Sequence, residues 1–482
     1  MSLDQPGVEL FEGFATRGLD QEETATPVFI GFTEKGQPGS LFFVETLTEF
    51  SDQLGGPLAP AQASDLAPVL FHTARHYFDN GGGGCFVCPL GNYAELEGLS
   101  GDALIARLDD ERIRQTVAGE RRIALVAVPD LVLLDGLSVA DDGSTWSRAW
   151  RSVLELCESR RGLFGLLDTP ASPELARQCA QRFCADVNSE RRAWVSAYWP
   201  RLVTDYERSA SPPESALAAR ARGASVLAVA TSAASVRLSY TGAQASGDQE
   251  RAIASVSVRA DDSTRKWKEV RASAFTWEVV PASGAVAAKI GECDRDRGIW
   301  TAPANLALSR VVKPISPQLD ADDLYSETGV SINLIRSFPG RGVRIWGCRT
   351  LADGTSTYWR YLQVRRLVGY IETSLAQLAR FVVFEPNNEI TWAKLKGQTL
   401  TWLRALWMRG ALAGVNEKDA FSVLVGLDES MTRDDIAVGR LVMTVDLAVL
   451  APAEFIQINL QFHTGETQTR SPNANRYEGE PS

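Results

Sequence analysis

The residues best placed for chemistry are two histidines and two cysteines in one short stretch, FHTARHYFDNGGGGCFVC, which runs from Phe71 to Cys88. His72 and His76 are four residues apart, so a helix would present both on one face. Cys85 and Cys88 have the spacing of one half of a zinc site. One hypothesis is therefore a zinc-dependent enzyme that binds its metal through these four side chains.

The residues around these side chains favour a structural interpretation instead. Phe86 and Val87 are strand formers, and Pro89 follows them closely. In a strand, positions three apart point to opposite faces, so Cys85 and Cys88 would diverge. The four glycines before them suit a helix that ends in a left-handed turn. The stretch therefore predicts a helix, a glycine turn and a strand, and we expect no metal and no cofactor.

Other catalytic patterns are missing from the sequence. The chain has three histidines, no Gly-x-Ser-x-Gly elbow and no phosphate loop that ends in Gly-Lys-Ser/Thr. The glycines from Gly81 follow a helix instead of opening one, which is the wrong geometry for phosphate. We therefore expect no enzyme. The charges of ECDRDRG, read as a loop, predict inter-subunit or structural ion pairs through Asp294, Arg295, Asp296 and Arg297.

The composition is that of an acidic globular protein. The chain has 482 residues, a formal net charge of −11 and a pI near 5.1, which argues against nucleic-acid binding because that needs cationic surface. Seven scattered cysteines suit a reducing compartment, and we expect assembly in the cytoplasm. The N-terminus has no basic start and no apolar run, so we expect no signal peptide. No stretch reaches the roughly 18 apolar residues of a membrane span.

Strand-like and helix-like patterns alternate along the first 206 residues, which predicts an α/β (mixed α+β) fold. RRIALVAVPD reads as a strand covered on both faces. TPASPELARQCAQRFCADV reads as a helix with Thr169 as its cap and Pro170 just inside. Residues 207–276 read as a small β-rich insertion. Later, FVVFEPN, FSVLVGL and RLVMTVDLAVL read as strands, and VRRLVGYIETSLAQLAR and TWAKLKGQTLTWLRALWMRG as helices.

Three further segments suggest contacts between chains. In SFPGRGVRIWGC, Pro339 and Gly340 predict a type II turn. The nearby arginines predict bidentate pairs with carboxylates, within the fold or across a contact; they are Arg336, Arg341, Arg344 and Arg349. At the chain ends, GVELF and EFIQINLQF are strand-like pieces suited to another subunit's sheet edge. Their apolar residues are Val8, Leu10, Phe455, Ile456, Ile458, Leu460 and Phe462.

These motifs together carry a family resemblance. GVSINLIRSFPGRGVRIWGCRTL, WRYLQVRRL, FVVFEPNNEITW, LWMRGALAG and RLVMTVDLAVLAPAEFI closely resemble the sheath protein of contractile phage tails and related injection particles. Upstream, TPVFIGFTEKG, YFDNGGGGCFVCPLG, LFGLLDTP and VVPASGAVAAKIGECDRDRGIWTAPAN fit the same family in the same order. The resemblance covers roughly Pro6 to His463, except the insertion at 207–276, where such proteins vary.

The resemblance implies a structural subunit that forms stacked hexameric rings around an inner tube and contracts to drive the tube into a target envelope. Its implied partners are other copies of itself, the tube protein, and baseplate and terminator proteins, in a phage-tail-like particle that is released or stays cell-bound. The implied divisions are an N-terminal arm (1–24), a middle α/β domain (25–206 and 277–305), the outer insertion (207–276), a C-terminal inner domain (306–453), a C-terminal arm strand (454–463) and a disordered tail (464–482).

Two points stay open at this stage. In similar proteins a helix of the C-terminal domain touches the tube, and the best match here carries Lys394, Lys396, Arg404 and Arg409. An ordinary solvated helix face is an equal alternative. The resemblance also allows a sheath-related baseplate or terminator component that caps the stack instead of building it.

Overall fold

The computed structural model describes residues 24–58, 67–137, 142–210, 226–232, 235–240, 255–260, 267–315, 324, 331–353 and 359–452, with side chains outside 207–277. Residues up to Leu450 belong to one compact unit. Among the described helices, none is long and apolar enough to cross a membrane.

An eight-stranded sheet organises the first part of the chain, in the order β14-β13-β6-β5-β4-β1-β3-β2. The strands from β13 to β3 are parallel to one another, and β14 and β2 pair antiparallel at the two edges. The bounds are β1 (Pro27–Thr33), β2 (Phe42–Val44), β3 (Cys85–Asn92), β4 (Leu125–Ala127), β5 (Phe164–Asp168), β6 (Val195–Trp199), β13 (Asn333–Phe338) and β14 (Gly342–Trp346).

Helices cover both faces of this sheet, and each face has its own hydrophobic core. The first core takes alternate residues of β1, such as Val28 and Ile30, and the second core takes Phe29. Burial on both faces confirms the α/β prediction and explains the continuous apolar run before Pro129. Over the first core lie α3 (Gly101–Leu108), α4 (Glu111–Gly119), α6 (Ser144–Glu158) and α7 (Pro173–Asp186). Over the second lie α1 (Leu47–Leu54), α2 (Leu70–Asp79) and α10 (Ser283–Arg297).

Short helical turns and a second sheet complete this part. The turns are η1 (Tyr93–Leu96), η2 (Pro129–Leu133), α5 (Leu134–Leu137) and α8 (Ser189–Arg192). The second sheet has the order β10-β11-β7-β12, and β8 pairs with β9. The bounds of these six strands, of which β8 and β9 form a separate pair, are β7 (Leu202–Ala210), β8 (Val226–Ser232), β9 (Ser235–Tyr240), β10 (Ser255–Ala260), β11 (Trp267–Val280) and β12 (Val311–Pro314). All described parts of 207–276 are therefore strands, as the sequence predicts.

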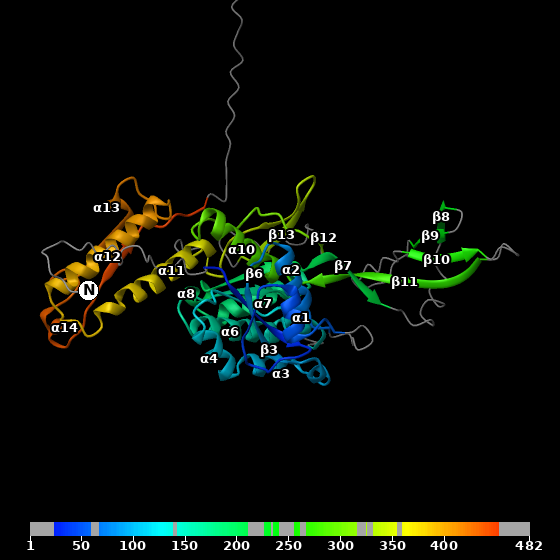
Figure 1. Ribbon diagram of the computed structural model, residues 1–482, viewed down its shortest axis with the longest axis horizontal. Helices are drawn as coiled ribbons and strands as arrows, with labels where there is room; N and C mark the ends of the chain where they lie inside the picture. Colours follow the sequence, from blue (N-terminus) through cyan, green and yellow to red (C-terminus); the bar gives the residue numbers. More distant parts are fainter. Residues whose placement is uncertain are drawn as a thin grey trace, which may run out of the picture. The chain divides into compact units, whose positions relative to one another are not determined.

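A third core lies in the C-terminal part, between the long helices that are yellow and orange in Figure 1. Leu367, Ile371 and Leu375 of α11 pack there with Leu395 and Leu403 of α12. α12 ends in the left-handed turn at Gly410 (φ 85°). The bounds are α11 (Leu362–Leu378), η5 (Ala379–Val382), α12 (Glu389–Met408), α13 (Glu417–Ala420), β15 (Phe421–Leu424), α14 (Arg433–Ala437) and β16 (Thr444–Leu447).

Three local predictions are wrong. FVVFEPN forms no strand: Phe381 and Val382 belong to η5 and pack against the third core, and the chain then enters a loop in which Phe384 is fully exposed and Val383 is 61% exposed. The segment has no described strand to pair with, so nothing holds it extended. The helix predicted from Thr169 begins instead after Ser172, whose hydroxyl accepts from Leu175 N–H, because the buried Thr169 hydroxyl donates to Tyr198 O. The charges of ECDRDRG lie on the last turns of α10, not in a loop.

The eight-stranded sheet takes strands from both sides of the predicted boundary between the middle and C-terminal segments, near residue 306. β13 pairs in parallel with β6, and β14 pairs with β13, so both strands extend the sheet of the middle segment although they fall within 306–453. The third core instead begins with Ile299 and α11. The sheet therefore crosses the predicted boundary, since strand pairing between distant segments leaves no local mark in the sequence.

Two buried aspartates hold the helices that cover the second core. Neither α2 nor α10 has a capping side chain of its own, because Val69 and Ala282 occupy their N-cap positions. Asp130 accepts hydrogen bonds from the N–H groups of Val69 (2.6 Å), Leu70 (3.0 Å) and Phe32 (2.6 Å). Asp168, the last residue of β5, accepts from the N–H and hydroxyl of Ser283 at 3.0 and 2.5 Å. Each carboxylate thus satisfies a helix start from a distant strand end.

We predict that Asp130→Asn lowers the free energy of unfolding by about 2–4 kcal/mol, since the amide keeps one acceptor but turns an N–H donor toward an N–H donor. Urea unfolding followed by tryptophan fluorescence measures the change. Asp109→Asn, at an exposed position after α3, is the matched control and should stay within about 0.5 kcal/mol of the natural chain. Equal midpoints for the two variants would contradict the role of Asp130.

Candidate functional site

The structure separates the four candidate metal ligands. α2 carries His72 and His76, Gly81 follows in a left-handed conformation (φ 86°), and β3 begins at Cys85. Cys85 packs in the second core and Cys88 in the first, so the two thiols lie on opposite faces of the sheet. The predicted helix, turn and strand are confirmed. In the described ranges, no group of three or more His, Cys, Asp and Glu residues could hold a metal ion.

Burial makes these side chains parts of the core. It raises the pKa of both thiols, that of Cys88 to about 12, and so disfavours the thiolate that a metal would need. His76 is fully buried, with its Nε2 atom 3.0 Å from Ser309 O. Burial lowers the pKa of this histidine to about 4, so the ring is neutral at neutral pH. The histidine therefore ties α2 to the segment after α10.

The hairpin β13–β14 carries the densest group of polar residues that the sequence singled out. Its turn is confirmed, because Arg341 N–H donates to Phe338 O and Gly340 has a φ of 71°. Arg336 lies opposite Arg344 on the two strands. On the same face, the rings of Phe338 and Trp346 are 4.7 Å apart, and Trp346 is 38% exposed. One face of the hairpin thus presents arginines and aromatic rings together.

The four arginines of this segment have different surroundings. Arg341 and Arg344 donate to Asn305, at 3.3 Å to its side-chain oxygen and 2.7 Å to its carbonyl, instead of to carboxylates. Arg349 is 1% exposed and donates to Ser331 Oγ at 2.9 Å. The structure therefore does not gather the four into one site, and the carboxylate partners stay a prediction for Arg336, Arg341 and Arg344.

The charged end of α10 contains a buried ion pair. Asp294 receives two hydrogen bonds from Arg366 of α11, at 2.6 and 3.0 Å, and the side chains are 5% and 3% exposed. Thr24 completes the group: its hydroxyl donates to Asp294 at 2.7 Å, and its carbonyl accepts from Arg366 at 2.7 Å. This pair joins α10, α11 and the segment that leads into β1. It is a structural ion pair.

The other charges of this run have separate roles. Arg295 donates to Gly81 O at 3.1 Å, which ties the end of α10 to the glycine turn after α2. Arg297 donates to Cys293 Sγ at 3.3 Å. Asp296 is exposed. The run thus combines internal contacts with one outward carboxylate.

The four basic residues near α12 are engaged to different degrees. Arg404 makes a bidentate pair with Glu417, with both distances 2.8 Å, and Lys396 lies 2.7 Å from Glu429. Lys394 lies over the ring of Phe381, at 4.7 Å. Arg409 lies over the ring of Trp300, at 5.3 Å. Two of the four charges are therefore balanced within the chain, which the sequence did not indicate.

The predicted exchange strands lie outside the described residues; they are Val8, Leu10, Phe455, Ile456, Ile458, Leu460 and Phe462. Sequence reasoning missed Arg366 and its neighbour Arg365. A signal was present, because VRRL places two arginines within the apolar stripe of a helix, where an unpaired charge would be costly.

Comparisons with known proteins agree with this geometry. Residues 355–463 match the family described as phage tail sheath C-terminal domain. The curated tail sheath protein of Vibrio phage KVP40 (isolate Vibrio parahaemolyticus/Japan/Matsuzaki/1991) is 26% identical over 129 residues, which span 26% of this chain and 19% of that protein. A chain in the cryo-EM structure of the anti-feeding prophage (AFP) baseplate in its contracted state is 33% identical, with a TM-score of 0.70, over 98% of this chain and 100% of that one. The chain belongs to the phage tail sheath family.

Other sheath structures share the fold at lower identity. A chain of the PVC sheath complex, from an extracellular contractile injection system in its contracted state, is 24% identical, with a TM-score of 0.57, over 98% of this chain and 100% of that one. A chain of the AFP helical sheath in its contracted state is 22% identical, with the same TM-score, over 95% and 99%. Sheath proteins are structural proteins.

We predict that His76 makes the stability of this sheath protein fall with pH below neutrality. Its pKa is about 4 in the folded chain and 6.5 in the unfolded chain, so the unfolded chain binds more protons between these values. The contribution is complete above pH 6.5 and is lost as pH falls toward 4. Urea unfolding should show that the natural chain loses about 3 kcal/mol more than His76→Gln over this window. Parallel pH profiles for the two chains would contradict this prediction.

Proposed function

We propose that this chain is the structural subunit of a contractile sheath, in which hexameric rings stack around an inner tube and shorten to drive the tube through a target envelope. The observation that carries the proposal is the 33% identity over the whole chain with a protein of a contracted AFP particle. A structural role, and not catalysis, accounts for a fold whose polar residues mostly tie helices and strands together.

Strand exchange between subunits is the proposed link within the sheath. In the described part of the chain, β15 and β16 form a sheet of two strands, so each has one edge without a strand partner. Open edges pair readily with a strand from another chain. The proposed donors are the arm strands around Leu10 and Ile458 of neighbouring copies. The backbone hydrogen bonds of such a strand would hold two subunits together while their bodies rotate.

The face of the β13–β14 hairpin is a second proposed contact. Arginine and tryptophan are the residue types enriched in the energetic centres of protein interfaces. Arg344 lies on this face beside Trp346, and its hydrogen bonds to described residues go to neutral oxygens of Arg341 and Asn305. A carboxylate of a neighbouring subunit, with Asp296 as one candidate, would balance its charge.

The proposed tube-facing surface remains α12. Lys394 and Arg409 are the cations of this surface that no described carboxylate balances, whereas Lys396 and Arg404 are paired internally. A reduced positive charge suits a sheath that must hold its tube weakly before it contracts, because long-range attraction grows with net charge. The further proposed partners are the baseplate and the terminator, with assembly in the cytoplasm of a particle that is later released or stays cell-bound.

A second candidate function is that of a sheath-related subunit at the baseplate. The 33% identical relative comes from a structure of the AFP baseplate, which also yields a second match at 23% in another structure, whereas the chains from the AFP and PVC sheath structures are 22% and 24% identical. This difference favours a subunit that adjoins the baseplate and starts or ends the stack. Such a subunit has the same fold and the same exchange of strands.

Deletion of residues 454–482 tests the exchange of strands. With its tube protein co-expressed, the full chain should give striated tubes in negative-stain micrographs, and the shortened chain should stay monomeric while keeping its unfolding midpoint. A matched control removes only 464–482, which keeps the arm strand and should still assemble. Normal tubes from the 454–482 deletion would refute the arm role.

The same micrographs separate the two candidate functions. Single rings or short caps from the full chain would support the baseplate candidate, and a chain that stays monomeric with its tube would refute both.

We predict that Arg344→Glu weakens assembly at least tenfold in critical concentration, measured by sedimentation, because it reverses the charge that a neighbouring carboxylate would meet. The matched control is Arg433→Glu, which makes the same charge reversal at an exposed arginine of α14. Arg433 has no ion pair among the described residues. Both variants should have a free energy of unfolding within about 0.5 kcal/mol of that of the natural chain. Unchanged assembly of Arg344→Glu would remove the hairpin face from the interface.

A further inference from the structure

The C-terminal part of the chain exposes a large share of its apolar side chains. Among the residues whose side chains the structure describes, ten large hydrophobic residues are exposed, and eight of these lie within 383–450. Single exposed apolar residues need no partner, but such a density in one part of the chain indicates contact surfaces. The eight are Val383, Phe384, Ile390, Met408, Val415, Leu424, Val438 and Leu450.

Phe384 combines full exposure with a strained backbone. Its φ of 74° lies in the left-handed region, which bulky side chains rarely adopt. Exposure of the ring and strain in the backbone both cost stability, and the fully exposed ring gains no packing within the chain in return. Strain of this kind is typical of positions that a contact or a reaction needs in one geometry.

The loop around this ring is held in place on both sides. The N–H of Glu385 donates to Val382 O at 3.0 Å, which closes the turn after η5. The side-chain oxygen of Asn387 accepts from the Trp392 indole at 2.6 Å, and its amide donates to Arg440 O at 3.0 Å. The exposed ring is therefore presented in a fixed position, and little entropy would be lost when it binds.

The opposite end of α12 carries apolar surface that could receive the ring. Met408 is 76% exposed and Val415 is 91% exposed. Each directly follows one partner of the hydrogen bond from the Trp407 indole to Gly414 O (3.1 Å), so both side chains belong to one region. Methionine is flexible and makes favourable contacts with aromatic rings. This region therefore matches an aromatic side chain in chemistry.

Charges next to the two apolar regions are opposite in sign. Glu385, directly after Phe384, is exposed and has no ion pair among the described residues. Lys418 of α13 is exposed and also lacks a described ion pair, and the adjacent Asp419 accepts from Asn416 at 3.2 Å. An acidic flank on one side and a basic flank on the other favour contact between them.

One chain cannot bring these two regions together by itself. They lie at the two ends of α12, whose 20 residues span about 30 Å. A second copy of the chain can, and it is the partner whose matching surface is present in the structure. Contact between different regions of two copies is head-to-tail, so it repeats from copy to copy as a closed ring or an open helix.

We propose that Phe384 inserts between Met408 and Val415 of a neighbouring copy, with Glu385 beside the Lys418 of that copy. The strained loop then acts as a preformed knob, and the end of α12 acts as its receptor. This inference rests on the proposed function, because it needs the chain to assemble, and it names one contact that the assembly would use.

Cross-linking of full-length chains co-assembled with the tube protein tests the contact. Glu385→Cys and Lys418→Cys chains, mixed and treated with a short bismaleimide, should give at least tenfold more covalent dimer than either variant alone. The natural chain gives the background from its own seven cysteines. The matched control mixes Lys418→Cys with Glu97→Cys, which alters an exposed glutamate of the middle segment, and should stay at background.

Each other outcome overturns the contact. Dimer from Glu385→Cys alone would mean that the loop meets its own copy in a neighbour. Normal tubes without dimer in the mixture would mean that Phe384 meets another surface, such as the tube, and would leave the proposed function intact. A chain that neither assembles nor cross-links would overturn both proposals.

Substitution of Phe384 separates strain from contact. Phe384→Asn should raise the urea midpoint of the dilute monomer, because asparagine adopts a positive φ at lower cost. The same variant should raise the critical concentration for assembly at least tenfold, as should Met408→Gln. The combined variant should be no weaker than either, since both remove one contact. Val312→Ser, at an exposed apolar position of β12, is the matched control and should assemble normally. Unchanged assembly of Phe384→Asn would overturn the proposal.

Discussion

The fold depends on two buried carboxylates, Asp168 at the end of β5 and Asp130 in η2, which follows β4. Asp130 and Asp168 receive the free N–H groups at the starts of α2 and α10, whose own N-cap residues, Val69 and Ala282, cannot. Burial raises the pKa of Asp130 to about 6 and that of Asp168 to about 7, while the donated hydrogen bonds favour the charged forms. Gly31 is required beside Asp130, because a Cβ atom there would lie 2.5 Å from its carboxylate.

Once α10 is fixed, it determines where the C-terminal helices attach. Its last turns bring Asp294 to Arg366, and this buried pair lies at the second turn of α11. Removing one partner would leave an uncompensated charge in a dry environment, which costs about 3–5 kcal/mol. The first turn of α11 adds Leu362 to the second core, and its later turns add Ile371 to the third. One helix therefore belongs to two cores, and the ion pair lies between them.

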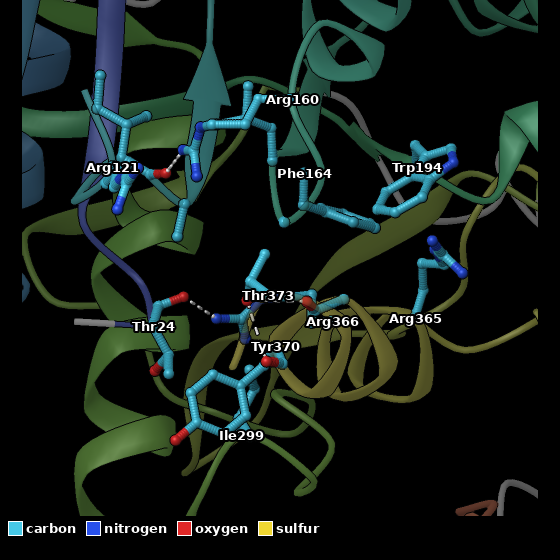
Figure 2. Close-up of a pocket in the computed structure, with 15 residues that line it drawn as sticks. Thr24, Arg121, Arg160, Phe164, Trp194, Ile299, Arg365, Arg366, Tyr370 and Thr373 are labelled. Atoms are coloured by element: carbon cyan, nitrogen blue, oxygen red, sulfur yellow. Dashed lines mark hydrogen bonds between the residues drawn. The ribbon is translucent and has the colours of Figure 1, made fainter. Parts of the chain in front are cut away.

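The sequence predicts local features well and distant pairings poorly. The helix, turn and strand around Gly81 follow from glycine and β-branched patterns, and the Pro339 turn follows from backbone preferences that need no tertiary context. The cap of α10 could not be predicted, because Asp168 lies 115 residues before Ser283. The strand expected around Phe384 failed for the related reason that β propensity needs a sheet or a core to cover it. A cavity beside α11 that is lined by four arginines draws its residues from six segments of the chain, and only the arginine pair in α11 marked it in the sequence (Figure 2).

The distribution of paired and unpaired groups explains how one chain can be stable alone and still assemble. The charges that would be most costly to leave alone, such as Asp294, are satisfied inside the subunit. Among the described residues, the groups left open are of a different kind: the outer edges of β15 and β16, the exposed ring of Trp346 and the exposed ring of Phe384. Water satisfies exposed edges and arginines at little cost, so they do not destabilise the monomer. A neighbouring chain can replace that water without rearranging any of the three cores.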